Sequence, residues 1–117
     1  MRDILRVLND TITARGSIVL SEDGLLIASE VRDGVDVDRL SALGAAIVNE
    51  IGASLRQAGL RAFSQVEVAA EQGKVILVKA GPAYLLVLLG ARIEVGPGSL
   101  EILSAASRVE REAELAA

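Results

Sequence analysis

The fold is decided by the stretch Gly16-Ser17-Ile18-Val19-Leu20-Ser21-Glu22-Asp23-Gly24-Leu25-Leu26-Ile27-Ala28-Ser29. Two short β-prone runs, 17–20 and 25–28, flank a polar tetrapeptide that ends in Asp-Gly. An Asp-Gly pair between two such runs is a strong hairpin signal, because both residues tolerate the positive φ of a tight turn. The stretch therefore predicts two antiparallel strands, and the rest of the chain is interpreted outward from them.

Helices are predicted before this hairpin, after it and at the end of the chain. Apolar residues at helical spacing within 1–12 indicate an amphipathic helix that ends before Gly16. Asp36 is a good N-cap for a longer helix that stops near Gly59, and Ser99 can cap a last helix. The apolar positions are Ile4, Leu5, Leu8 and Ile12 in the first helix, Leu40, Leu43, Gly44, Ile47, Ile51 and Leu55 in the second, and Leu100, Leu103, Ala106 and Val109 in the third. Residues 110–117 are expected to fray.

Three more strands are predicted between the second and third helices. Residues 63–70 alternate imperfectly, with Phe63, Gln65 and Glu67 on one face, whereas 75–78 and 84–89 are apolar on both faces. Strands that are apolar on both faces need cover on both, so helices should pack on each side of an antiparallel sheet. The expected order is α-β-β-α-β-β-β-α, in one mixed α/β (α+β) domain over residues 1–117.

The composition indicates a globular domain that does not bind nucleic acid. The chain has 117 residues, of which 51% are hydrophobic, as expected for one globular domain with a real core. Its formal net charge is −4, and it has one Phe, one Tyr and no Trp. A nucleic-acid binder usually needs a positive field or aromatic stacking surfaces, so we expect no nucleic-acid partner.

Catalytic and metal chemistry has little support in this sequence. The chain contains neither Cys nor His, which excludes disulfides, thiol nucleophiles, histidine triads and the usual zinc ligands. The acidic pairs at 22–23 and 36–38 are typical of a turn and of a helix start. The glycine-rich stretch 90–99 lacks the lysine of a phosphate loop and the third glycine of a dinucleotide site. We expect no catalytic residue, metal or cofactor.

No targeting or membrane-spanning segment is predicted. The N-terminus has no continuous apolar run, and the apolar stretch 75–91 is interrupted by Lys79, Gly81 and Pro82. The absence of cysteine is compatible with a reducing compartment. We therefore expect a cytoplasmic protein without direct membrane insertion.

The predicted second helix carries a further pattern on the side opposite its apolar positions. Small residues recur there at i, i+4, i+7 and i+11, namely Ala42, Ala46, Asn49 and Ala53. The residues that flank this stripe, and that are candidate partner-binding residues, are Arg39, Glu50 and Arg56. Small side chains let another helix approach closely, and a charged rim around an apolar centre is typical of an interface. Alanine's helix propensity explains the stripe without a partner, but the geometry favours a dimer contact.

Taken together, these segments resemble the roadblock family, which includes roadblock-type dynein light chains and bacterial and archaeal relatives that act on small Ras-like GTPases. The resemblance covers roughly residues 4–108. Its most specific part is the hairpin 16–29, and the small-residue helix around 40–46, the strand at 65–68 followed by Gly73, and the strand at 83–87 occur in the family's order.

The resemblance implies a profilin-like fold: an antiparallel sheet of strand order 2-1-5-4-3, with the long helix on one face and the terminal helices on the other. It also implies a homodimer that pairs the second helices and joins the third strands. The carried-over interface residues are the stripe Ala42, Ala46, Asn49 and Ala53, and Phe63, Gln65 and Glu67 near the third strand. If the chain supplies an arginine to a GTPase in trans, the loop and helix-start candidates are Arg32, Arg39 and Arg92, and the pattern does not choose among them.

Three hypotheses about function follow. The first is a homodimer that binds and regulates a small Ras-like GTPase, for example in a cell-polarity system, where it accelerates GTP hydrolysis without being an enzyme itself. The second is a scaffold subunit of a motor or membrane-recruitment complex that ignores the nucleotide state of the GTPase. The third is an enzyme or small-ligand sensor on a profilin-like sheet, which ranks last because no convergent polar groups are identified.

Overall fold

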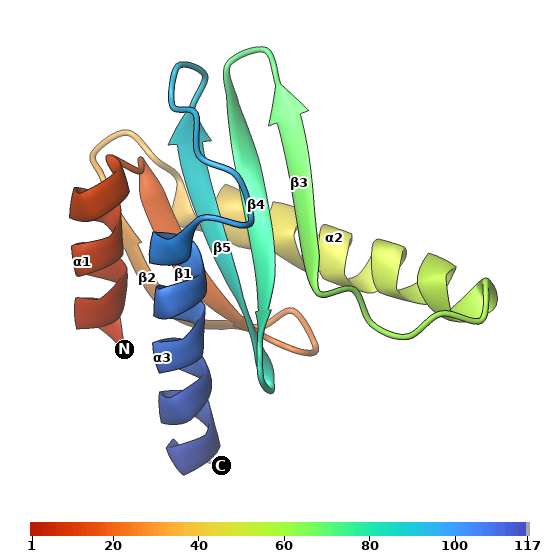
Figure 1. Ribbon diagram of the computed structural model, residues 1–117. Helices are drawn as coiled ribbons and strands as arrows, with labels where there is room; N and C mark the ends of the chain where they lie inside the picture. The colour runs from red at the N-terminus through yellow and green to blue at the C-terminus, as the bar shows by residue number, and fades with distance from the viewer. Residues whose placement is uncertain (117) are drawn as a thin grey trace.

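A five-stranded antiparallel sheet forms the centre of the structure, a computed structural model that describes residues 1–116 (Figure 1). The elements are α1 (Arg2–Ile12), β1 (Gly16–Ser21), β2 (Leu26–Val31), α2 (Val37–Gln57), β3 (Gln65–Ala70), β4 (Gly73–Ala80), β5 (Ala83–Gly90) and α3 (Leu100–Ala116). The strand order is β2-β1-β5-β4-β3, and every neighbouring pair is antiparallel. Both the element order and the strand order confirm the prediction.

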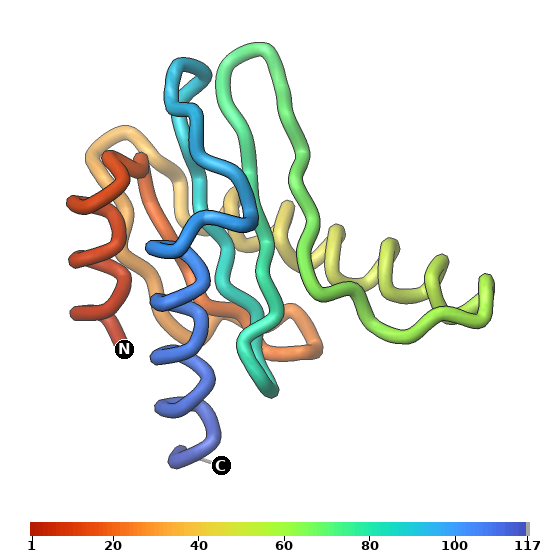
Figure 2. The backbone as a smooth tube through the Cα atoms, viewed as in Figure 1, coloured from red at the N-terminus to blue at the C-terminus, as the bar shows by residue number. Residues whose placement is uncertain are grey.

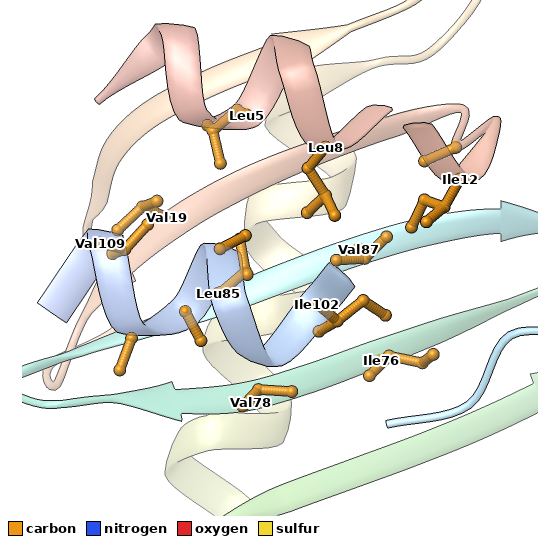
Figure 3. Packing of buried hydrophobic residues seen from close by; sticks show 14 of the residues in the cluster. Leu5, Leu8, Ile12, Val19, Ile76, Val78, Leu85, Val87, Ile102 and Val109 are labelled. Carbon is orange, nitrogen blue, oxygen red and sulfur yellow. The ribbon is translucent and has the colours of Figure 1, made fainter. Parts of the chain in front are cut away.

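The sheet lies between two helical layers, with α1 and α3 on one face and α2 on the other (Figures 1 and 2). Figure 3 shows the core under α1 and α3, where Leu5, Leu8 and Ile12 meet Ile102 and Val109 above side chains of the inner strands. A second core under α2 contains Ile18, Leu20, Leu77 and Leu86 of the sheet and Leu40, Ile47 and Val48 of the helix. Helices on both faces explain why residues 75–78 of β4 and 84–89 of β5 are apolar on both sides of the sheet.

The predicted strand boundaries differ from the structure by one to three residues. β2 begins at Leu26 and continues to Val31, three residues beyond the predicted strand, because Gly16 and Ser17 of β1 extend the ladder to Val31 and Glu30. α3 continues through Ala116, so residues 110–116 are helical in the structure, and residue 117 lies outside the described residues. The fraying expected over residues 110–117 stays a prediction.

Two contacts hold the last turns of α3 in place. The N-terminal ammonium of Met1 lies 2.8 Å from the Glu112 carboxylate, and Ala113 packs against the core under α1. Within residues 1–116, no helix combines the length and the apolarity that crossing a membrane requires.

α2 is the element that reaches furthest from the sheet. It starts over the side of the sheet that carries β1 and β2, and its last turns extend past the β3 edge (Figures 1 and 2). Its buried positions end at Gly52, and Ile51 and Leu55 are half-buried. The chain then returns through residues 58–64 to enter β3.

Candidate functional site

The outer side of α2 displays the predicted small-residue stripe. Ala42, Ala46 and Asn49 are exposed and Ala53 is half-buried, while the opposite side of the helix packs on the sheet. Asp36 caps the helix, since its carboxylate accepts a hydrogen bond from the Arg39 amide at 3.2 Å. The structure therefore places all four small residues on the side of α2 that faces away from the sheet.

The hairpin turn supports this helix from one side. Gly24 has a φ of +85°, and a Cβ at this position would stand 2.9 Å from the Cβ of Ala45 on α2. Glycine is therefore needed both for the left-handed backbone and for the close approach. The contact fixes the turn against α2 next to Asn49, so the hairpin also orients the stripe.

The charged residues that flank the stripe are exposed. The side chain of Arg39 is 90% exposed and lies 3.6 Å from the Asp36 carboxylate, an ion pair too solvated to hold it firmly. Glu50 and Arg56 are also exposed, about three and almost five turns further along the helix. All three can reach a partner that lies on the outer side of α2.

β3 forms an edge of the sheet and pairs only with β4 among the described residues. In an antiparallel ladder, successive residues direct their backbone N–H and C=O groups alternately toward and away from the neighbouring strand. The Lys79 amide donates to the Ser64 carbonyl at 2.8 Å, which fixes this alternation. The residues whose backbone groups point away from β4 are therefore Gln65, Glu67 and Ala69. β3 thus offers a row of unused backbone donors and acceptors.

The two edges of the sheet are not equivalent. In β2 the register shifts opposite the Val19–Leu20 step, which leaves Ile27 without a partner in β1. Such a bulge twists an edge and discourages pairing with another strand. The register of β3 is continuous over all six of its residues. Of the two edges, β3 is the one suited to accept a further strand.

Phe63 corrects the predicted interface. It was expected on the same face as Gln65 and Glu67, but its ring is 8% exposed and lies 5.0 Å from the Tyr84 ring, in the core under α2. Gln65 pairs with Val78, which belongs to the opposite core. Residue 63 precedes β3, so the alternation of the strand does not reach it. Phe63 is a core residue of its own chain.

Sequence reasoning missed an apolar surface beside α2. Leu43 was assigned to the core, yet it is 44% exposed, and Val68 is 43% exposed. Leu43 and Leu88 line a hollow of about 320 Å³ at the start of α2. On the same face of the sheet, Val68 lies in one cross-strand row with Val75 and Leu88.

The next row of this face has almost no side chains. It consists of Ala70, Gly73 and Gly90, which are paired across β3, β4 and β5. Small residues in strands that are otherwise bulky are the feature of the sequence that could have indicated this uncovered surface. We call the set Leu43, Val68, Leu88, Ala70, Gly73 and Gly90 the apolar shelf.

The three candidate arginines have different surroundings. Arg32 is used inside the chain, because its Nε donates to the Ala14 carbonyl at 2.7 Å and its Nη2 to the Asn9 carbonyl at 3.4 Å, at the end of α1. Arg92 is exposed in the loop that follows β5. Arg39 alone stands beside the small-residue stripe.

Acidic residues do not gather into a metal site. Among residues 1–116, no three acidic side chains lie close enough together to hold an ion. Glu22 of the hairpin turn is instead paired with Lys79, whose Nζ lies 2.9 Å from its carboxylate and 4.8 Å from the centre of the Tyr84 ring.

Comparison with known proteins agrees with this architecture. The model of the Roadblock/LC7 domain family matches residues 2–89. The uncharacterized protein MJ0714 of Methanocaldococcus jannaschii is 31% identical over 107 residues, which cover 92% of this chain and 91% of that protein.

Solved structures with the same fold are also found. MglB of Myxococcus xanthus aligns with a TM-score of 0.84 at 20% identity, over 97% of this chain and 94% of that one. An MglB structure described as having a tetrameric arrangement also gives 0.84, at 19% identity over 99% and 89% of the two chains. Acanthamoeba castellanii profilin II gives 0.51 at 18% identity over 89% and 90%, which confirms the profilin-like fold.

Proposed function

The chain belongs to the Roadblock/LC7 domain family, and we propose that it is a cytoplasmic, homodimeric regulatory module that binds a small Ras-like GTPase and modulates its nucleotide cycle. The observation that carries the proposal is the regular, unpaired β3 edge beside the apolar shelf and the outer side of α2. A second copy gives the β3 edge a neighbouring strand. It also covers the apolar shelf.

In the proposed dimer, β3 pairs antiparallel with β3 of the second copy. The last turns of α2 extend past β3 (Figure 1). In the proposed dimer they lie over the partner's apolar shelf. Ile51 and Leu55, half-buried within one chain, gain cover there. Ala46, Gln65 and Glu67 contribute to this interface, together with Ala42, Asn49 and Ala53.

The backbone of β3 limits the register of this pairing. Only residues with outward-pointing groups can exchange hydrogen bonds, so the two-fold axis passes through residue 66, 67 or 68. An axis at Glu67 sets two carboxylates directly opposite each other, which is destabilising. An axis at Val68 instead brings together two apolar side chains that are 43% exposed, whereas Val66, at the remaining axis, is already half-buried in its own chain. We therefore favour the register centred on Val68.

The GTPase is proposed to bind across the paired α2 helices, where Arg39, Glu50 and Arg56 of both copies are exposed. The chain has no histidine or cysteine, and it supplies contacts rather than a reaction centre of its own. Acceleration of GTP hydrolysis is the mode of regulation to test first, with Arg39 as the arginine placed to reach the bound GTPase.

The proposal is tested by retaining lysate proteins of the source organism on the immobilised chain, once with GDP and once with a non-hydrolysable GTP analogue. Mass spectrometry identifies the retained proteins. A Ras-like GTPase enriched only with the analogue supports the regulator and leads to hydrolysis assays. Equal retention in both nucleotides replaces it with the scaffold hypothesis, and retention of no GTPase overturns both.

A further inference from the structure

α1 and α3 lie side by side on the face of the sheet opposite α2 (Figures 1 and 2), and a groove lies between them. The groove is open to solvent, and its volume is about 190 Å³. The residues that line it include Ile4, Val7 and Thr11 of α1, and Glu101, Ser104 and Arg108 of α3. Val7 is 55% exposed, so the groove has an apolar wall that no part of the described chain covers.

Two opposite charges on α3, Glu101 and Arg108, lie at equal distances on either side of the middle of this groove. Glu101 and Arg108 are seven residues apart, which places them on the same side of the helix about 10.5 Å apart along its axis. Neither takes part in an ion pair among residues 1–116. Glu101 accepts a hydrogen bond only from the neutral Ser99 hydroxyl, at 3.0 Å. Both charges are exposed and free for a partner.

We propose that this groove is a second self-association surface, in which α3 of another copy lies antiparallel to α3 about a two-fold axis near Ser104 and Ala105. The antiparallel arrangement sets Glu101 of each copy opposite Arg108 of the other, so both ion pairs form at once. A parallel arrangement would set like charges opposite each other. The charge pattern therefore selects both the occupant and its direction.

The centre of the surface suits close contact between helices. Ser104, at the midpoint between the two charges, is exposed and small, which lets the two α3 helices approach closely. Val7 of α1 supplies apolar area next to it. An apolar centre between charged ends has the anatomy of a specific protein interface.

This surface does not depend on the dimer proposed through β3. The α1–α3 layer and α2 lie on opposite faces of the sheet, so both surfaces can be occupied at once (Figure 1). Because each β3-paired dimer carries two copies of the α1–α3 surface, this contact joins such dimers into tetramers and larger assemblies. Without the β3 pairing, the α1–α3 contact alone still forms a dimer.

Charge-reversal variants test the inference by sedimentation velocity over a range of protein concentrations up to several hundred micromolar. Glu101→Arg and Arg108→Glu each replace two attractive contacts with two repulsive ones. Each variant alone should lose the higher assembly, with the association constant falling roughly tenfold or more. An equimolar mixture of the two variants should recover it, because every contact between unlike copies is again attractive.

Two controls separate this outcome from a general effect of charge. The double variant Glu101→Arg with Arg108→Glu restores complementarity within one chain and should assemble like the native protein. Glu114→Arg makes the same charge change on an exposed position of α3 outside the groove, and should leave assembly unchanged. The inference is overturned if the native protein does not associate further at any concentration in the range. It is also overturned if the single variants assemble as well as the native protein. A mixture of the two variants that fails to recover the assembly overturns it as well.

Discussion

Gly44 of α2 lies directly against Leu20 of β1: a Cβ at position 44 would stand 2.5 Å from the Leu20 Cδ1 atom and 2.9 Å from Leu86 Cδ1. Both leucines are completely buried, so they can make room only by displacing other core side chains. The absence of a side chain at this one position sets how closely α2 packs on the sheet. The outer side of α2, and the stripe on it, is positioned by this contact.

Gly44→Ala should therefore destabilise the protein, although alanine favours helix. Overpacking of a core costs about 1–3 kcal/mol, which outweighs the gain of about 1 kcal/mol in helix propensity. Gly52→Ala is the matched control on the same helix, because its Cβ would meet only the end of the exposed Arg56 side chain, at 3.3 Å. Urea unfolding should show a lower midpoint for the first variant and an equal or higher one for the second.

Ala46→Glu should shift the protein toward monomer without unfolding it. Ala46 is exposed on the outer side of α2, so the charge is tolerated in one chain but is repeated across the two-fold contact in a dimer. Sedimentation at micromolar concentration measures the shift, with Ala91→Glu in an exposed loop as the control. If the Ala46 variant remains as dimeric as the control, the α2 contact is assigned to the wrong residues.

Ala69→Pro should abolish pairing of the β3 edges while leaving the sheet intact. The Ala69 amide points away from β4, so proline removes only a donor that the single chain does not use. Val68→Pro is the matched control, because the Val68 amide points toward β4 and its loss removes a hydrogen bond of the ladder. At micromolar concentration, thermal unfolding and sedimentation should show a folded monomer for the first variant and a strongly destabilised chain for the second.

Phe63→Ala should act on folding rather than on association. Loss of a buried phenylalanine ring costs about 3–5 kcal/mol, and this ring packs against Tyr84. Leu60→Ala, in the same loop but 59% exposed, should change stability by less than about 0.5 kcal/mol. Urea unfolding distinguishes the two; equal and small effects would return Phe63 to the list of interface residues.

Arg32→Ala and Arg39→Ala should separate a structural arginine from a partner-binding one. Arg32 bonds to carbonyl groups at the end of α1, so its loss should lower the free energy of unfolding by about 1 kcal/mol. Arg39 is 90% exposed, and its replacement should leave stability unchanged. In an assay of GTP hydrolysis by the bound GTPase, the proposed role of Arg39 requires a loss of stimulation from Arg39→Ala only.

Local sequence patterns predicted most of the fold. The Asp-Gly turn, the N-cap at Asp36 and the cap at Ser99 are all found, because each depends on backbone geometry within a few residues. The strand order was predicted only through family resemblance, since a hairpin signal says nothing about which strand lies beside β1.

The candidate surfaces were predicted less completely. Helical periodicity placed Ala42, Ala46 and Asn49 correctly on the outside of α2. It failed for Leu43, whose exposure depends on where α2 crosses the sheet, and strand alternation failed for Phe63, which lies just outside β3. Both errors come from contacts between elements that are distant in the sequence.

The sequence by itself determined the elements, their amphipathic sides and the absence of cysteine and histidine chemistry, because these are properties of short segments and of composition. Only the tertiary structure decided which edge of the sheet is free to pair. It also decided that Arg32 donates hydrogen bonds to carbonyl groups at the end of α1, and that Glu101 and Arg108 border an open groove. These features arise from the packing of separate segments, and packing is fixed by the whole chain at once.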